Sequence, residues 1–236
     1  MTASTAKSAY WAGLRDGLPF VFIVVPFAVL FGVVAIDAGL SLAQTMGFTV
    51  LVIAGAAQFA AVQLMLDNAA IGLILLAALA VNLRMAMYSA ALVPYLGAAP
   101  LWQRAVISYL NFDQNYMVAV AKYEEAPEMS VNDRVHYFAG VSSAIAPLWC
   151  ISTLVGALLG TAIPEAWALD FVLPIAFLSM VAPMLRTVAH MAAAFVSIVV
   201  ALALIGLPAG AGLLIAAVCA MFTGVLVESW LEGRAA

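Results

Sequence analysis

Long runs of apolar residues, separated by short polar stretches, dominate this sequence. Of its 236 residues, 67% are apolar and 8% are charged, whereas a soluble domain has about 25% charged residues. Because a helix needs about 20 apolar residues to cross a bilayer, we predict an all-α, polytopic membrane protein with about seven or eight transmembrane helices, some of them broken at Pro or Gly. The expected segments are 18–36, 42–66, 69–95, 103–122, 135–161, 168–185, 187–206 and 209–228.

Lysines and arginines near the segment ends predict the orientation, because positive residues stay on the cytoplasmic side of a membrane. With eight spans and the N-terminus inside, Arg104 alone falls outside and Arg84 lies within a span. We therefore predict a multi-pass plasma-membrane protein with a cytoplasmic N-terminal stretch, 1–17, and a single transmembrane domain, 18–236. The polar stretch 123–134 is expected to be a water-exposed loop. The remaining positive residues, all expected in the cytoplasm, are Lys7, Arg15, Lys122, Arg134, Arg186 and Arg234.

Charge and motifs exclude several classes of protein. Eight Lys and Arg residues against 12 Asp and Glu give a formal net charge of −4, without a basic cluster that would bind nucleic acid. The sequence has no GxSxG elbow, no HExxH and no glycine-rich phosphate loop. Cys150 and Cys219 stand alone in apolar stretches, without metal-ligand spacing. We therefore expect neither an enzyme nor a bound metal or cofactor, and the remaining chemistry is binding and transport.

Three expected segments carry residues that disrupt helices at membrane depth. These are Pro26 in the first segment, the run 55–58 (Gly-Ala-Ala-Gln) in the second, and Pro174 with Pro183 in the sixth. Broken helices form binding sites in transporters, because free N–H groups attract anions and exposed carbonyl oxygens attract cations. A proline can also be a simple kink with a packing role. The run 55–58 is the better candidate for a binding site.

Charged residues inside the membrane are costly and mark functional positions. Arg84 lies near the middle of the third segment, and Tyr88 shares its helix face one turn later. In the next segment Asp113 is a counter-charge, so we predict that it pairs with Arg84 or carries a proton. A purely structural ion pair between two helices is the alternative.

Further polar and small residues indicate contacts inside the helix bundle. Residues 111–116 contain four polar groups, which predict a seam that faces the bundle interior. Phe59, Phe112 and Phe177 are candidate walls of an apolar pocket, or ordinary core residues. Gly156 and Gly160 have the GxxxG spacing of close helix packing.

Four stretches give the chain a resemblance to the AzlC family, the larger subunit of bacterial branched-chain amino acid exporters. They are 55–59, the Asn-Leu-Arg of 82–84 followed by Tyr88, the Asp113 segment, and 170–174. Two residues depart from the family pattern. Met85 replaces a histidine that commonly follows the arginine, and Gln114 replaces an acidic residue after Asp113, which puts in doubt any proton path through those groups.

The resemblance implies export of neutral branched-chain amino acids across the bacterial inner membrane, together with a small AzlD-type membrane subunit. A zwitterion needs a partner for its carboxylate, which Arg84 or the N–H groups near Gly55 supply, and one for its ammonium, which Asp113 or kinked carbonyls supply. Asp113 is also the candidate for proton coupling in an antiport. The candidate substrate-binding residues are Gly55, Gln58, Phe59, Asn82, Arg84, Asp113 and Gln114.

Two other classes of function remain open at this point. A passive channel for small solutes needs a continuous polar lining, whereas the polar groups here gather in a few places. A scaffold or sensor subunit without transport would use Arg84 and Asp113 for structure only.

Overall fold

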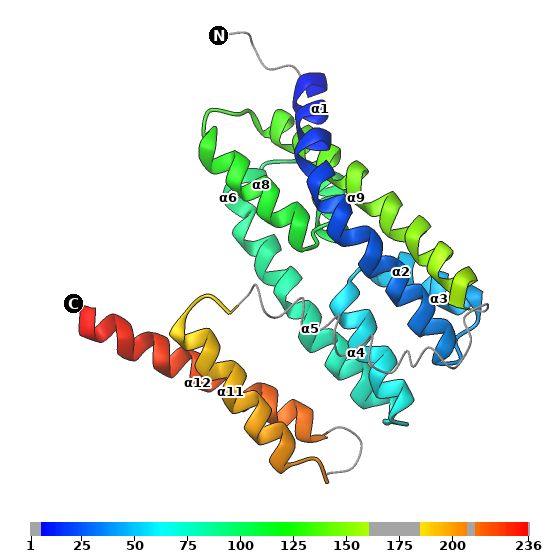
Figure 1. Ribbon diagram of the computed structural model, residues 1–236. Coiled ribbons are helices and arrows are strands. Elements are labelled where there is room, and N and C mark those ends of the chain that lie inside the picture. The colour runs from blue at the N-terminus through cyan, green and yellow to red at the C-terminus, as the bar shows by residue number, and fades with distance from the viewer. Residues whose placement is uncertain (1–5, 161–184, 207–210, 236) are drawn as a thin grey trace. The chain divides into compact units, whose positions relative to one another are not determined.

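Every regular element in the described part of the chain, residues 6–160, 185–206 and 211–235 of the computed structural model, is a helix (Figure 1). The all-α expectation is confirmed there. Residues 168–184, with Pro174, Phe177 and Pro183, lie outside the described residues. The elements are α1 (Ala6–Gly17), η1 (Leu18–Phe20), α2 (Val21–Asp37), α3 (Leu42–Val52), α4 (Gly55–Leu66), α5 (Ile71–Ala91), α6 (Val93–Leu96), α7 (Leu101–Tyr109), α8 (Asp113–Glu125), α9 (Val131–Gly160), α11 (Val188–Ala203) and α12 (Ala211–Ala235).

The helices belong to two compact units. Unit 1 comprises residues 1–59 and 79–164, and unit 2 comprises 60–78 and 165–236. Among the residues that the structure describes, three helical stretches are long and apolar enough to cross a membrane: Ala6–Asp37, Ile71–Ala91 and Val131–Gly160.

In unit 2, α11 and α12 pack antiparallel. Thr187 caps the start of α11 by accepting a hydrogen bond from the His190 backbone N–H, at 3.2 Å. A Cβ added to Gly212, early in α12, would contact Leu204 after the end of α11, whereas one added to Gly224 would contact Ala193. The two helices therefore form a hairpin.

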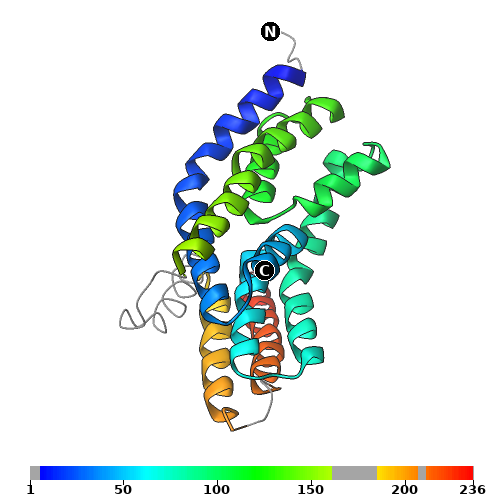
Figure 2. The same cartoon turned by 90° about the vertical axis from the view of Figure 1, so that its right-hand side faces the viewer.

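The continuous run α1–η1–α2 lies parallel to α9 in unit 1, side by side in both views (Figures 1 and 2). Gly13 in α1 packs against the start of α9 at Tyr137, and Gly32 in α2 packs further along at Thr153. The predicted close packing of Gly156 is confirmed, since it lies against the backbone of Val29. We call the end of unit 1 where α1 and α9 begin the near end, and the end where α2 and α9 finish the far end.

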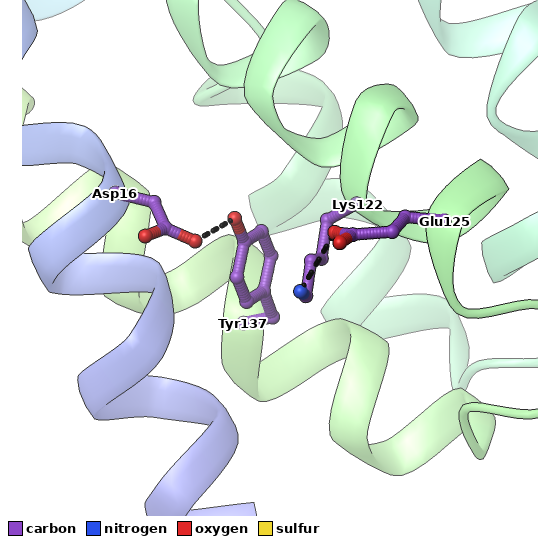
Figure 3. Close-up of polar contacts among 4 residues, drawn as sticks. All are labelled: Asp16, Lys122, Glu125 and Tyr137. Atoms are coloured by element: carbon purple, nitrogen blue, oxygen red, sulfur yellow. Dashed lines mark hydrogen bonds and ion pairs between the residues drawn. The ribbon is translucent and has the colours of Figure 1, made fainter.

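Polar contacts join the helices at the near end. The Tyr137 hydroxyl of α9 donates to Asp16 Oδ2 of α1 at 2.7 Å, and Lys122 pairs with Glu125 on α8 at 2.9 Å (Figure 3). The exposed pair within α8 contributes little to stability because water screens it. The Tyr137 contact, in contrast, ties two separate helices together.

The chain enters and leaves the α7–α8 segment at the same end of unit 1. Tyr95, just before the 97–100 connection, packs its ring 5.4 Å from that of Tyr123 near the end of α8. The Arg134 guanidinium, just after the 126–130 connection, lies 5.5 Å from the Tyr95 ring. Both connections therefore lie at the near end, so α7 runs inward and α8 runs back.

The reversal occurs at 110–112, where Phe112 is extended (φ −80°, ψ 169°) and α8 begins at Asp113. The prediction of one continuous helix over 103–122 is therefore wrong. Arg104 lies in α7 at the near end, with Lys122, whereas the sequence prediction placed these two residues on opposite sides of the membrane. The polar stretch 123–134 is a shorter connection than predicted, because α8 continues to Glu125 and α9 begins at Val131.

This re-entrant topology predicts that cysteines at Ala98 and Glu128, one in each connection, react from the same side of the membrane. An impermeant thiol reagent added to oriented vesicles should label both variants from one face only, after Cys150 and Cys219 are replaced by alanine. A segment that crossed the membrane would place the two cysteines on opposite faces, and labelling from opposite faces would contradict the re-entrant arrangement.

A second reversal, between α3 and α4, starts from the far end. Ser41 accepts a hydrogen bond from the Gln44 backbone N–H and so caps the start of α3. Ile53, with φ +38°, ends that helix. The amide of Gln58 then reaches back to Thr49 Oγ1 at 3.3 Å, a contact that nine residues of straight helix, about 13 Å long, would not permit.

The break expected in the second segment is thus confirmed, at residues 53–54, immediately before the predicted run 55–58. In the first segment α2 continues through Pro26 from Val21 to Asp37, so of the two alternatives for this proline the helix break is not observed. Its only interruption is the short turn of 3₁₀ helix at 18–20.

The two re-entrant tips meet inside unit 1. The Tyr109 hydroxyl at the end of α7 donates to the Val50 carbonyl near the end of α3. The helices have 9 and 11 residues, or lengths of about 13 Å and about 16 Å, whose sum is close to the roughly 30 Å thickness of a bilayer core. Each helix is therefore about half as long as a bilayer core is thick.

Candidate functional site

Arg84 on α5 and Asp113 at the start of α8 form an ion pair. Arg84 Nη1 lies 3.0 Å from Asp113 Oδ2, and the two side chains are 23% and 28% exposed. The predicted pairing of these residues is confirmed. Because each charge balances the other, neither stands alone in an apolar environment.

Tyr88 completes the contacts of the Asp113 carboxylate. Its hydroxyl donates to Asp113 Oδ1 at 3.0 Å, so both carboxylate oxygens have partners. The Tyr88 ring stacks on Tyr116, one turn along α8, with centroids 4.2 Å apart and planes 10° apart. The expectation that Tyr88 and Arg84 share one face of α5 is confirmed, and the stack holds the hydroxyl in place.

The ion pair lies deep within unit 1. The 13 residues of α8 place Asp113 about 18 Å from the polar connection at the near end, more than half of a roughly 30 Å bilayer core. Asp113 also stands in the first turn of its helix, where the helix dipole favours a negative charge. The pair therefore lies at the reversal of the chain at 110–112, beside the tip of α7.

Asn115, one turn into α8, presents a carbonyl oxygen that lacks a donor. Its amide nitrogen donates to the Leu110 carbonyl at 2.7 Å and to Ser142 Oγ at 2.6 Å. The Ser142 hydroxyl itself donates to the Phe138 carbonyl at 2.9 Å, so it accepts from Asn115 and the orientation of the amide is fixed. Asn115 Oδ1 is buried and has no partner among the described residues.

Other buried polar atoms around the tips also lack partners within the described residues. The fully buried Gln58 and Asn111 donate to Thr49 and to Ser89, each at 3.3 Å, while their carbonyl oxygens receive no hydrogen bond. Asn82 Oδ1 and Arg84 Nε are likewise buried and have no hydrogen-bond partner among the described residues. Because an unsatisfied buried group costs about 1–3 kcal/mol, this region favours a ligand that supplies both donors and acceptors.

The first turn of α4 is closely packed. A Cβ on Gly55 would lie 2.8 Å from both Phe27 Cε1 and Trp149 Cη2, so only glycine fits there without movement of these rings. Phe59 is fully buried, with its ring 4.8 Å from that of Phe27. Of the sequence candidates in this turn, Gln58 alone offers a polar group.

The structure thus brings the sequence candidates together in two groups. Arg84 and Asp113 form one group, on α5 and α8, and the first turn of α4 forms the other. The last turn of α3 lies between α4, which it contacts through Thr49, and α7, which it contacts through Val50. Gln114 is half-buried beside Asp113. Within the described ranges, no three His, Cys, Asp or Glu side chains are placed to hold a metal ion.

Sequence reasoning passed over Asn111, Asn115 and Tyr109 as individual site residues. The first two were expected only as part of a polar seam. An acidic residue such as Asp113 is typical of the first turn of a helix, and this signal favoured a helix start at the reversal. No sequence pattern marked Tyr109, because its hydrogen-bond partner is a backbone carbonyl on a helix that is distant along the chain.

Comparison with known proteins agrees with this architecture. Residues 19–163 match the family model described as AzlC protein. The chain is 24% identical over 187 residues to the inner membrane protein YgaZ of Escherichia coli (strain K12), an alignment that covers 73% of this chain and 72% of that protein. No solved structure matches the chain. The match to the family model covers more than half of the sequence, and the chain therefore belongs to the AzlC family, a family of membrane proteins associated with transport.

Proposed function

We propose that this protein is the large subunit of an exporter for neutral, branched-chain amino acids, and that its substrate binds at the Arg84–Asp113 pair. The observation that carries the proposal is the mid-membrane pair itself, surrounded by buried polar atoms that lack partners. These atoms include the Arg84 Nε donor and the Asn111 and Asn115 acceptors. An α-amino acid offers the complementary groups, a carboxylate and an ammonium.

The substrate binds by taking over the ion pair. Its carboxylate moves onto Arg84, and its ammonium moves onto Asp113. One neutral arrangement of charges replaces another, so the site remains balanced in a medium where a lone charge is costly. Tyr88 and Tyr116 keep the Asp113 carboxylate in place during this exchange.

An apolar side chain requires an apolar wall beside the charges. Phe112 immediately precedes Asp113 and is 8% exposed, so it is the nearest aromatic residue along the chain to the ion pair. Phe59 stands in the buried cluster next to the other tip. These rings favour valine, leucine and isoleucine over polar amino acids.

Three further parts of the proposal concern the assembly in its membrane. The partner is a small AzlD-type membrane subunit, as the family resemblance implies. The near end faces the cytoplasm, because five of the six Lys and Arg residues of unit 1 lie there and the sixth is Arg84. These five are Lys7, Arg15, Arg104, Lys122 and Arg134. Proton antiport supplies the energy: a proton and the substrate ammonium compete for Asp113, so the site carries one or the other.

The direct test measures how unlabelled compounds compete with the efflux of labelled leucine from cells that contain this chain and the small subunit. Unlabelled leucine should compete, whereas leucinamide, which lacks the carboxylate, and 4-methyl-2-oxopentanoate, which lacks the ammonium, should not. Both charges are needed to replace both partners of the ion pair. Equal competition by all three compounds would contradict zwitterion binding, and conductance without saturation would favour a channel.

A further inference from the structure

A pocket of about 460 Å³ lies between the α5–α6 turn and α7, at the near end of unit 1. Most of its wall is apolar, with side chains such as Leu92, Leu96 and Ile107. Its polar lining residues are Arg104, Ser108 and Ser89. The volume lies in the range of pockets that hold small molecules.

The polar lining residues form a line from the near end toward the candidate site. Arg104 and Ser108 are one turn apart on the same face of α7. Ser89, on the opposite wall, accepts a hydrogen bond from Asn111 at the re-entrant tip. The residue next to Ser89 is Tyr88, which holds Asp113. The inner wall of the pocket thus adjoins the reversal at 110–112, which immediately precedes Asp113.

Arg104 is an exposed cation in this largely apolar pocket. Of the ion pairs among the described residues, one joins Arg84 to Asp113 and the other joins Lys122 to Glu125. Arg104 takes part in neither. A guanidinium in a pocket with low-dielectric walls attracts anions, and it binds carboxylates with two parallel hydrogen bonds.

We propose that this pocket is the entry vestibule of the transport site, in which Arg104 binds the substrate carboxylate before Arg84 receives it. The proposal rests on the proposed function, and it adds a second anion-binding residue and a route. From Arg104 to the end of α7 at Tyr109 the helix covers about 8 Å. The two arginines are therefore successive contacts for one carboxylate, and the apolar wall between them accepts the branched side chain.

The effect of Arg104 on the charge inside the vestibule is measured by the rate of cysteine labelling, which does not depend on a transport assay. In the complete complex with Cys150 and Cys219 replaced by alanine, Ser108→Cys is labelled with an anionic reagent, 2-sulfonatoethyl methanethiosulfonate, and with a cationic one, 2-(trimethylammonium)ethyl methanethiosulfonate. Arg104→Gln should lower the ratio of the anionic to the cationic rate about tenfold, because one charge about 6 Å away in water changes each rate about threefold. Arg15→Gln, which removes another exposed near-end arginine, is the control and should leave the ratio unchanged.

Leucine then tests the route. Leucine added on the near-end side should slow the labelling of Ser108→Cys, and Arg104→Gln should raise the concentration needed for this protection several-fold. An unreactive cysteine, or a ratio that Arg104→Gln leaves unchanged, overturns the vestibule. Absence of protection in a complex that still exports leucine overturns the route alone. A complex that exports no neutral amino acid overturns the proposed function, while the labelling ratio still decides whether the pocket collects anions.

Discussion

Replacing Arg84 with alanine is expected to reduce leucine efflux to the background of cells without the protein. The variant removes the proposed carboxylate partner and leaves Asp113 without its counter-charge at mid-membrane depth. Removal of one partner from a hydrogen-bonded, buried charge pair costs about 2–5 kcal/mol, which corresponds to a 30-fold or greater loss of binding. Initial efflux rates of labelled leucine, normalised to the amount of protein in the membrane, measure the effect.

Two further variants separate binding from folding. Arg84→Asp combined with Asp113→Arg restores a neutral pair and should restore the amount of folded protein, but not efflux, because the two charges now face the wrong ends of the substrate. Asp113→Asn tests coupling, because any efflux that remains in this variant should no longer depend on the proton gradient. Normal efflux in the double variant would mean that the pair is only structural, and an unchanged pH dependence in Asp113→Asn would exclude Asp113 as the proton carrier.

The pairing of Arg84 with Asp113 could be predicted from the sequence because the physical constraint is strong. A charge far from any polar segment end needs a partner, and Asp113 was the carboxylate in the neighbouring segment. That Tyr88 lies on the same helix face as Arg84 followed from helix periodicity alone. In both cases the decisive information is local along the chain or imposed by the membrane.

The direction of the 101–125 segment could not be predicted in the same way. Hydropathy counts the apolar residues of a segment, and two short helices that enter and leave at one face have the same count as one helix that crosses. The distinction lies in the contact of Tyr95 with Tyr123, between residues that are far apart in the sequence. With Arg104 beside Lys122 at the near end, unit 1 no longer has an exception to the positive-inside pattern.

The two tips explain why polar groups gather at one level of unit 1. A re-entrant helix leaves its terminal N–H or carbonyl groups unpaired inside the membrane, so neighbouring side chains or a ligand must satisfy them. Asn115 does so for the Leu110 carbonyl, and Tyr109 does so for Val50. The amide oxygens that remain unpaired are a consequence of this arrangement, and they mark where a substrate gains most by binding.

Gly140→Ala is expected to destabilise the scaffold that holds these tips, by about 1–3 kcal/mol for the overpacking. A Cβ at this position in α9 would lie 2.0 Å from the Tyr10 carbonyl oxygen and 2.8 Å from the Leu14 backbone nitrogen. Both are backbone atoms of α1, so no side chain can move aside and the two helices must separate. The midpoint of thermal unfolding in detergent, followed by size-exclusion chromatography, measures the loss.

Gly47→Ala provides the matched control with the opposite sign. Gly47 lies inside α3, and a Cβ there would meet nothing within 4 Å. Alanine should therefore stabilise the helix by about 0.5–1 kcal/mol through its better helix propensity. If the two variants unfold at the same temperature, close approach of α1 and α9 at Gly140 is not what limits stability. If Gly140→Ala alone unfolds early, the parallel pair of helices is the frame against which both tips are held, and the mid-membrane site depends on it.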